Sequence, residues 1–140
     1  MKEKKDYSGV YIAYTDSGYH IGRNEGAYSY VLILDGEIVC RDAVLFSHET
    51  NNRGELMAII AAISHCPEDA QVEIRTDSQY AVNTLTGVWL QRRNRDLFQQ
   101  WHSIVRSRRL KVSVVWIKAH NGDPYNEMCD QMCCDASARI

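Results

Sequence analysis

The segment 50–63 is the part of this sequence that most restricts the fold. Four large apolar side chains recur in it at helical spacing: Leu56, Met57, Ile60 and Ile63. The alanines between them have high helix propensity. A helix this apolar must be buried over most of its circumference, so it has to lie against another layer of structure.

Glu55 falls in the first turn of this predicted helix, at the edge of the apolar surface. An ionised carboxylate near a buried helix start needs a partner, which can be backbone N–H groups, a base or a cation. One interpretation is an acid that only complements the helix dipole. The other is a functional carboxylate, and the acids elsewhere in the chain favour it.

The remaining segments predict the layers that could cover this helix. Segments 9–16, 27–34 and 37–46 have the β-branched and aromatic content of strands, and Asp35-Gly36 is a two-residue hairpin signal, so they should form an antiparallel meander. Helices are expected at 52–65, 78–85, 96–106 and 124–138, and further strands at 71–76 and 111–118. This order predicts an α/β fold in which helices lie on the faces of a mixed sheet.

Composition excludes several classes of protein. A chain of 140 residues fits one domain, with a frayed segment expected at 1–7. The net charge of −2 gives no overall attraction to nucleic acid, so any such attraction must be local. No apolar run approaches the roughly 20 residues that cross a bilayer, and the charged N-terminus is not a signal peptide. We expect a cytoplasmic monomer with no membrane partner.

Cysteine is the other compositional signal. The chain has five cysteines, and Cys129, Cys133 and Cys134 crowd one segment at a spacing that places thiols on consecutive helical turns. A zinc site is one interpretation. Buried free thiols in a reducing cytosol are the favoured one.

Four acids come from four separate elements and could meet. Asp16 ends the first predicted strand and Asp77 ends the fourth; if these strands are parallel neighbours, both carboxylates reach the same end of the sheet. Glu55 begins a helix, and Asp130 lies in the second turn of the last one. Carboxylates this close stay ionised only around divalent cations, and oxygen ligands favour Mg²⁺ or Mn²⁺. Two such ions roughly 3.5–4 Å apart support phosphodiester hydrolysis.

Each of these residues also has an ordinary explanation when it is taken alone. Asp16 and Asp77 could be turn residues that bond their own backbone. Asp130 could lie on a solvated helix face, and His120 could be an unremarkable loop histidine. Convergence depends on the strand order, which residue spacing does not give.

Four short motifs, taken in order, resemble a known family. They are Thr15-Asp16, the run Thr50-Asn51-Asn52-Arg53-x-Glu55-Leu56, the run Thr76-Asp77-Ser78-Gln79-Tyr80, and the segment from Lys118 through His120 to Asp130. In this order and spacing, over nearly the whole chain, the sequence resembles type 1 ribonuclease H. The segment 94–101 also looks like a helix start of that family.

The resemblance implies a fold, an activity and a metal site. The fold would be a five-stranded mixed sheet of order 3-2-1-4-5, with the first three strands antiparallel and helices on both faces. The activity would be endonucleolytic hydrolysis of the RNA strand of RNA–DNA hybrids, leaving 5′-phosphate and 3′-hydroxyl ends. Two Mg²⁺ ions, with Mn²⁺ as an alternative, would be held by Asp16, Glu55, Asp77 and Asp130, and Asp16 would bridge both. His120 would assist proton transfer or product release.

The resemblance also implies residues that contact the hybrid. Thr50 would approach a DNA-strand phosphate, and Asn51, Asn52 and Gln79 would meet the minor groove, where amides can contact 2′-hydroxyls. The family's long basic protrusion is nearly absent here, and only the segment 91–95 fills its place. We expect Arg92, Arg93 and Arg95 to contact the DNA strand with Trp89 packed alongside; the alternative is a solvated helix end.

Other departures concern the first metal ligand and the helix beside it. Ser17-Gly18 stands where the family usually has Gly-Ser, and Gly54 replaces a larger residue at a cost of up to ~1 kcal/mol in helix propensity. Two alternative functions follow from the same fold. A catalytically silent hybrid-binding module would have no reason to hold four acids. A transposase or resolvase would not need the polar runs around Asn51 and Gln79.

Overall fold

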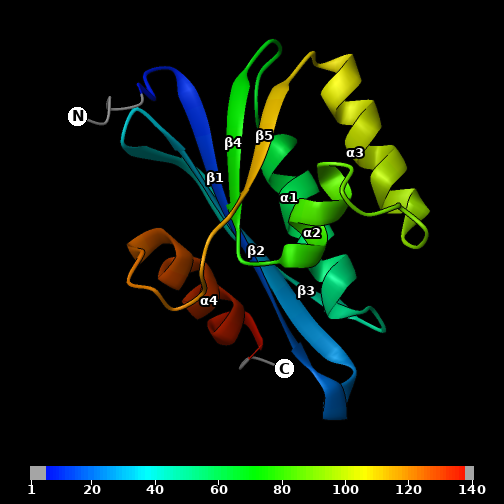
Figure 1. Ribbon diagram of the computed structural model, residues 1–140. Coiled ribbons are helices and arrows are strands. Elements are labelled where there is room, and N and C mark those ends of the chain that lie inside the picture. The colour runs from blue at the N-terminus through cyan, green and yellow to red at the C-terminus, as the bar shows by residue number, and fades with distance from the viewer. Residues whose placement is uncertain (1–5, 138–140) are drawn as a thin grey trace.

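A five-stranded mixed sheet in the order β3-β2-β1-β4-β5 lies at the centre of the computed structural model (Figure 1). The structure describes residues 6–137, so most of the segment expected to be frayed lies outside the described residues. The strands β1 (Val10–His20), β2 (Glu25–Leu34) and β3 (Glu37–Ser47) form an antiparallel meander. The strands β4 (Gln71–Thr76) and β5 (Lys111–Trp116) run parallel to β1. The predicted strand order and directions are confirmed.

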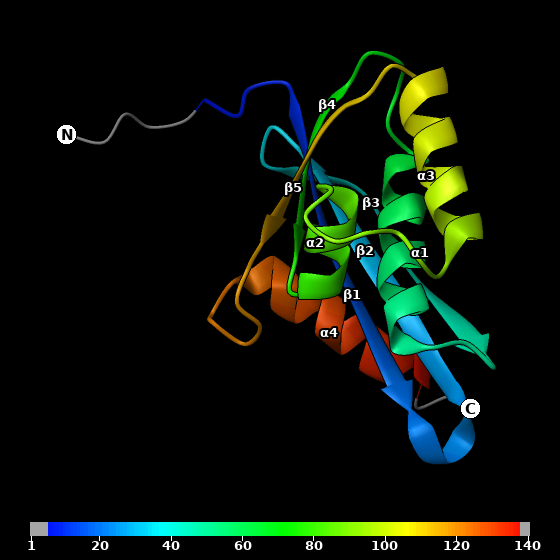
Figure 2. The same cartoon turned by 45° about the vertical axis from the view of Figure 1, so that its right-hand side comes forward.

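Helices cover both faces of this sheet. On one face lie α1 (Asn51–Ile63), α2 (Gln79–Leu85) and α3 (Arg95–Ser107). On the other face α4 (Pro124–Ser137) crosses β1, β2 and β3, as Figures 1 and 2 show from two directions. A short 3-10 turn, η1 (Ile21–Arg23), joins β1 to β2. In the described part of the chain, none of the helices has the length and apolar character needed to cross a membrane.

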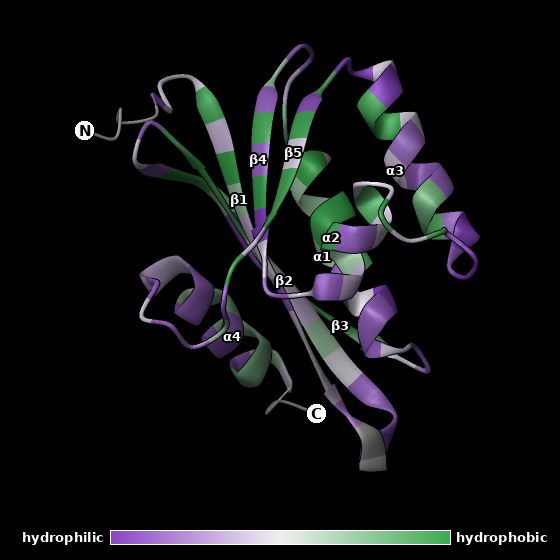
Figure 3. Ribbon diagram, in the orientation of Figure 1, coloured by the Kyte–Doolittle hydropathy of each residue, from purple (hydrophilic) through white to green (hydrophobic). Residues whose placement is uncertain are grey.

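The larger core lies between the sheet and α1. Ile59, Ala62 and Ile63 of α1 are fully buried in the same core cluster as Val72 and Ile74 of β4. Figure 3 shows the contrast between α1, which is largely hydrophobic, and α3, where hydrophilic and hydrophobic residues alternate. The N-terminus of α1 is capped by Thr50, whose hydroxyl accepts a hydrogen bond from the Arg53 N–H at 3.2 Å. The prediction that this helix is largely buried is confirmed.

A smaller core lies under α4. Cys129 packs there with Tyr14 and Val31, and its thiol donates to the Tyr14 carbonyl at 3.4 Å. All five cysteines are free thiols. Cys129 and Cys133 are buried as the favoured interpretation predicts, but Cys134 is exposed. One residue advances the helix by about 100°, so adjacent cysteines cannot share a face.

Two element boundaries differ from the prediction in ways that matter for the site. β1 does not end at Asp16 but continues to His20, because residues 17–20 still pair with β2 after β4 has ended at Thr76. Asp16 thus lies inside a strand, where one neighbouring strand stops. Glu55 lies in the second turn of α1 rather than the first, because the helix begins at Asn51. β5 is two residues shorter than predicted.

Candidate active site

Three carboxylates meet where β1 passes the end of β4. Asp16, Glu55 and Asp77 each offer an oxygen, and these atoms all lie within 4.8 Å of one another. The register explains the approach of two of them, since Thr15 of β1 pairs with Thr76 of the parallel strand β4 and each acid is the next residue. Glu55 reaches the same place from α1, which packs against β1.

The close approach of α1 depends on Gly54. A Cβ on this residue would collide with the Ser17 hydroxyl and lie 2.9 Å from the Phe46 ring. The Ser17 hydroxyl in turn donates to the Asn51 side-chain oxygen at 2.9 Å, which ties the first turn of α1 to β1. The glycine therefore has a packing reason that outweighs its cost of about 1 kcal/mol in helix propensity.

Burial and mutual repulsion shift the ionisation of the three acids. Asp16 and Glu55 are only 7% and 5% exposed. Burial, with the charge of Asp77 next in size, raises the pKa of Asp16 to about 7, although its bond from the Ser17 N–H opposes the shift. Burial and the two aspartates raise the pKa of Glu55 well above its usual value. Burial also raises the pKa of Asp77. Without a cation, the cluster is not fully ionised at neutral pH.

The residues of this cluster fit a divalent cation. Glu55 Oε2 is buried and has no hydrogen-bond partner, although a buried carboxylate oxygen without a partner is costly. Glu55 is also outside the first turn, so it does not simply complement the helix dipole. The three offered atoms are all oxygens, which are the ligands that Mg²⁺ and Mn²⁺ prefer.

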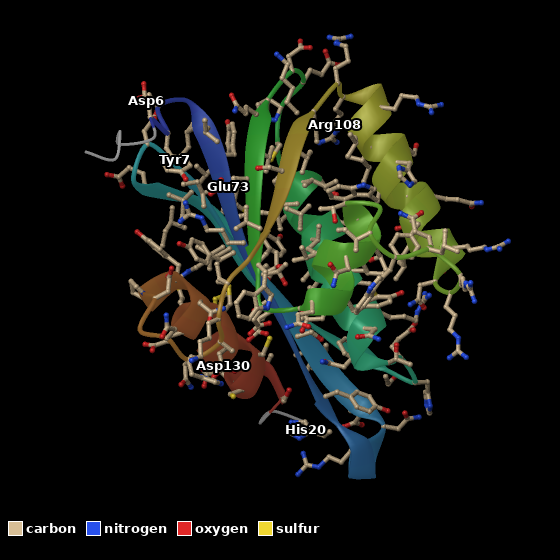
Figure 4. All side chains as sticks on the ribbon, viewed as in Figure 1. Asp6, Tyr7, His20, Glu73, Arg108 and Asp130 are labelled. Atoms are coloured by element: carbon tan, nitrogen blue, oxygen red, sulfur yellow. The ribbon has the colours of Figure 1, made fainter. Side chains whose placement is uncertain are left out.

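The three acids open into a polar hollow of about 450 Å³. Asp130 lines this hollow from α4, where Figure 4 labels it, but it is not one of the three closely grouped acids. His120 lines it from the loop between β5 and α4, with a left-handed backbone (φ 55°), and its charge opposes the rise in the pKa of Asp77. The five predicted catalytic side chains thus face one hollow from four elements and a loop.

Three of the predicted substrate-contacting residues also line this hollow: Asn51, Asn52 and Gln79. An adjoining hollow of about 290 Å³ shares Asn52 and Tyr80 with it, and Thr50, Arg92 and Arg93 line it as well. Trp89 and Arg95 line neither of the two hollows. Trp89 is 48% exposed in the connection between α2 and α3, so its packing beside the arginines stays a prediction.

Sequence reasoning assigned no role to a network of side chains beside these two hollows, which includes Arg53, Asn94 and Asp96. Arg53 makes two hydrogen bonds to Asp96, at 2.9 and 2.7 Å, and one to Asn94 at 3.3 Å. Asn94 donates to the Tyr80 hydroxyl at 2.8 Å, so α1, α2 and the start of α3 are held together. Arg53 stands inside one of the quoted motifs, but nothing in the motif says which residue it contacts. Ser17 and Ser78 also line the first hollow.

Comparison with known proteins identifies the family. The model of the RNase H family matches residues 8–138. This chain belongs to the ribonuclease H family. It is 35% identical to a ribonuclease H of Campylobacter curvus over 120 residues, which cover 76% of this chain and 78% of the relative. It is 31% identical to a ribonuclease HI of a Synechocystis species (85% and 82% covered) and 27% identical to a ribonuclease H of Treponema denticola (91% and 96% covered).

The resemblance to type 1 ribonuclease H is therefore confirmed, and so is the prediction of an enzyme. Ribonucleases H are metal-dependent endoribonucleases that act on RNA–DNA hybrids. The three grouped acids of this chain can bind a divalent metal ion, as that dependence requires.

Proposed function

We propose that the protein hydrolyses the RNA strand of RNA–DNA hybrids by a two-metal-ion mechanism and leaves 5′-phosphate and 3′-hydroxyl ends. The observation that carries the proposal is the group of three carboxylate oxygens within 4.8 Å at the base of a polar hollow. Family membership supports the substrate class.

Asp16, Glu55, Asp77 and Asp130 would hold the two ions, and Mg²⁺ fits this all-oxygen set. Asp16 would contribute from β1, where the register places it directly beside Asp77. Bound divalent cations supply Lewis-acid stabilisation to a phosphodiester that undergoes in-line displacement. The protein contributes a fixed placement of Asp16 and Asp77, since each directly follows the last residue pair between the adjacent strands β1 and β4.

His120 would carry protons at the mouth of the hollow. An imidazole nitrogen can donate or accept a proton, so this side chain can protonate the leaving 3′-oxygen or help the product to leave. Its loop contains Gly122, whose φ of 83° lies in the left-handed region that favours glycine. His120 is exposed, which suits a group that exchanges protons with solvent.

Selection of a hybrid would come from polar side chains around the two hollows. The amides of Asn51, Asn52 and Gln79 can accept and donate hydrogen bonds to 2′-hydroxyls, which DNA lacks. Arg92 and Arg93, with Thr50, would contact phosphates of the DNA strand in the adjoining hollow. Such contacts recognise shape and sugar, so we expect no base-sequence preference.

All four acids face the hollow, which argues against a silent hybrid-binding module. The test is a cleavage assay on end-labelled RNA–DNA hybrid, double-stranded RNA and double-stranded DNA, with Mg²⁺, with Mn²⁺ and with a chelator. We expect metal-dependent cutting of the hybrid RNA alone, with products that carry a 5′-phosphate. Cutting that persists in chelator, or that favours double-stranded DNA, would contradict the proposal.

We also propose a cytoplasmic location and a monomeric state. Five free thiols suit a reducing compartment, where cysteines stay reduced. Sedimentation of the purified protein in the presence of a reductant tests the monomer directly.

A further inference from the structure

A chain of polar side chains crosses the α4 side of the sheet next to the acid cluster. Glu73 and Arg75 lie on β4, Tyr14 on β1 and Asp123 just before α4. Arg75 donates to Glu73 from Nε at 2.8 Å, and its Nη1 donates to the Tyr14 hydroxyl at 2.7 Å. The Tyr14 hydroxyl donates to Asp123 Oδ2 at 2.9 Å. The tyrosine thus bridges a cation on the sheet to an anion in the loop before α4.

The register of the sheet relates this chain to the active site. Tyr14 and Arg75 pair directly across β1 and β4. Tyr14 stands two residues before Asp16 on β1, so the two side chains point to the same side of that strand. Arg75 stands two residues before Asp77, which directly follows β4. Glu73 is two residues further back on β4, and Figure 4 labels it toward the opposite end of the sheet from Asp130.

Asp123 links this network of side chains to two residues of the site, His120 in the loop and Asp130 on α4. Its Oδ1 accepts hydrogen bonds from the N–H groups of Tyr125 at 3.0 Å and Asn126 at 3.3 Å, so it caps the N-terminus of α4. It follows His120 by three residues in the loop, and Asp130 lies two turns along the helix that it caps. One carboxylate therefore joins the sheet, the loop and α4.

Burying polar and charged side chains at this place costs free energy of folding, and apolar side chains could fill the same space. Tyr14 is 3% exposed and Glu73 5% exposed, and the Arg75 guanidinium lies 5.5 Å from the centre of the Tyr14 ring. Buried ionic groups rarely stabilise a fold more than apolar side chains of the same volume would, but they fix geometry because only one arrangement satisfies every partner. A positional role explains why these groups are here.

We propose that Tyr14, Arg75 and Glu73 are positioning residues that act through Asp123 to fix the start of α4, and thereby the placement of Asp130 and His120 relative to the three grouped acids. The inference rests on the proposed function for its catalytic consequence. The hydroxyl of Tyr14 is the connection that the test targets, since it contacts both Arg75 on the sheet and Asp123 before α4.

The test removes that hydroxyl. Tyr14→Phe keeps the ring and its packing, so the variant should fold. In Mg²⁺, we expect kcat for cleavage of the hybrid to fall by about tenfold, while KM changes by less than about twofold. The reason is that the substitution affects the placement of the reacting groups rather than the binding of the hybrid. In metal-free protein, amide hydrogen exchange at residues 125–127 should accelerate by about tenfold, because the cap of α4 loses its anchor.

Tyr30→Phe is the matched control. Tyr30 is 4% exposed, and its hydroxyl makes a 2.8 Å hydrogen bond to His65 on the opposite face of the sheet. Tyr30→Phe should lose about as much free energy of unfolding as Tyr14→Phe, but its kcat and its amide hydrogen exchange at 125–127 should not change. A fall in kcat that is equal in both variants would show a merely structural role for Tyr14 and overturn the inference.

Asp123→Asn provides a second, independent variant. Asparagine still caps helices through its single oxygen, but its other polar atom is an N–H donor, so the Tyr14 hydroxyl loses the acceptor that Asp123 provides. Its kcat should match that of Tyr14→Phe, and the double variant should lose no more. Additive losses would overturn the inference. A wild-type protein that fails to cut the hybrid would overturn the proposed function instead, while exchange at 125–127 would still decide whether Tyr14 anchors α4.

Discussion

The Ser17 hydroxyl of β1 packs directly against the backbone of Gly54 in α1, with no room for a Cβ between them. Glu55 is the next residue, so this contact sets how far its carboxylate reaches into the acid cluster. The Phe46 ring closes the other side of the same glycine.

The first prediction concerns this contact. Helix propensity alone would make Gly54→Ala stabilising by about 1 kcal/mol. We expect a loss of about 1–3 kcal/mol in the free energy of unfolding instead, because the methyl group overpacks the interface. Urea denaturation measures it, and Gly22→Ala, where no atom lies within 4 Å of the added Cβ, is the control. A stabilised Gly54→Ala protein would show that α1 can move away from β1 freely.

The second prediction concerns Asp77. Asp77→Asn should abolish Mg²⁺-dependent cleavage of hybrid RNA and leave the fold intact. The metal-free variant should also be more stable than wild type by about 1 kcal/mol, because a charge is removed from a crowded cluster. Cleavage assays and thermal unfolding in chelator measure the two effects. Asp135→Asn, an exposed substitution on α4, should change neither. Residual cleavage at the wild-type rate would mean that the metal ligands are misassigned.

The third prediction follows from the pKa of Asp16. A carboxyl whose pKa is about 7 in the folded protein and near 4 when unfolded binds its proton more tightly in the folded state. Folded-state stability from this group is therefore lost as pH rises from about 4 to about 7. In chelator, the stability of Asp16→Asn relative to wild type should increase over that range and then level off. A pH-independent difference between the two proteins would contradict the raised pKa.

Saturating Mg²⁺ should reverse that pH trend in wild type. A cation that binds only the folded, ionised cluster adds stability by mass action, and the gain should grow with pH as the proton is displaced. Asp16→Asn should show little of this gain. Equal Mg²⁺ stabilisation of both proteins would place the cation elsewhere.

The fourth prediction concerns His120. His120→Ala should slow turnover by about tenfold to a hundredfold without eliminating it, since a positioned acid or base contributes only part of the rate. His102→Ala is the control, because His102 lies on α3 away from both hollows of the site. Complete loss of cleavage in His120→Ala would point to an indispensable proton transfer.

The fifth prediction distinguishes the arginines that we propose contact phosphates, in the connection before α3, from an arginine elsewhere on the surface. Arg92→Ala and Arg93→Ala should each weaken hybrid binding and reduce the slope of log affinity against log salt by about one. Arg106→Ala, in the last turn of α3, should leave the slope unchanged. A flat salt titration for wild type would remove the proposed phosphate contacts altogether.

The sequence by itself determined the elements and their order. The periodicity of 50–63 required a buried helix, the Asp35-Gly36 turn specified a hairpin, and four motifs in order were enough to identify the family. These features depend on neighbours within a few residues, where backbone sterics and side-chain spacing act directly.

Only the tertiary structure decided how those elements meet. Asp16 is next to Asp77 because β1 and β4 are parallel and in register, and β1 continues past the site because β2 is longer than β4. The pairing of Arg53 with Asp96, which no motif specifies, likewise joins helices far apart in the sequence. The bridge from Arg75 through Tyr14 to Asp123 spans 109 residues at its longest step. Such contacts are set by the packing of layers, because no local pattern encodes which distant side chain will satisfy a buried polar group.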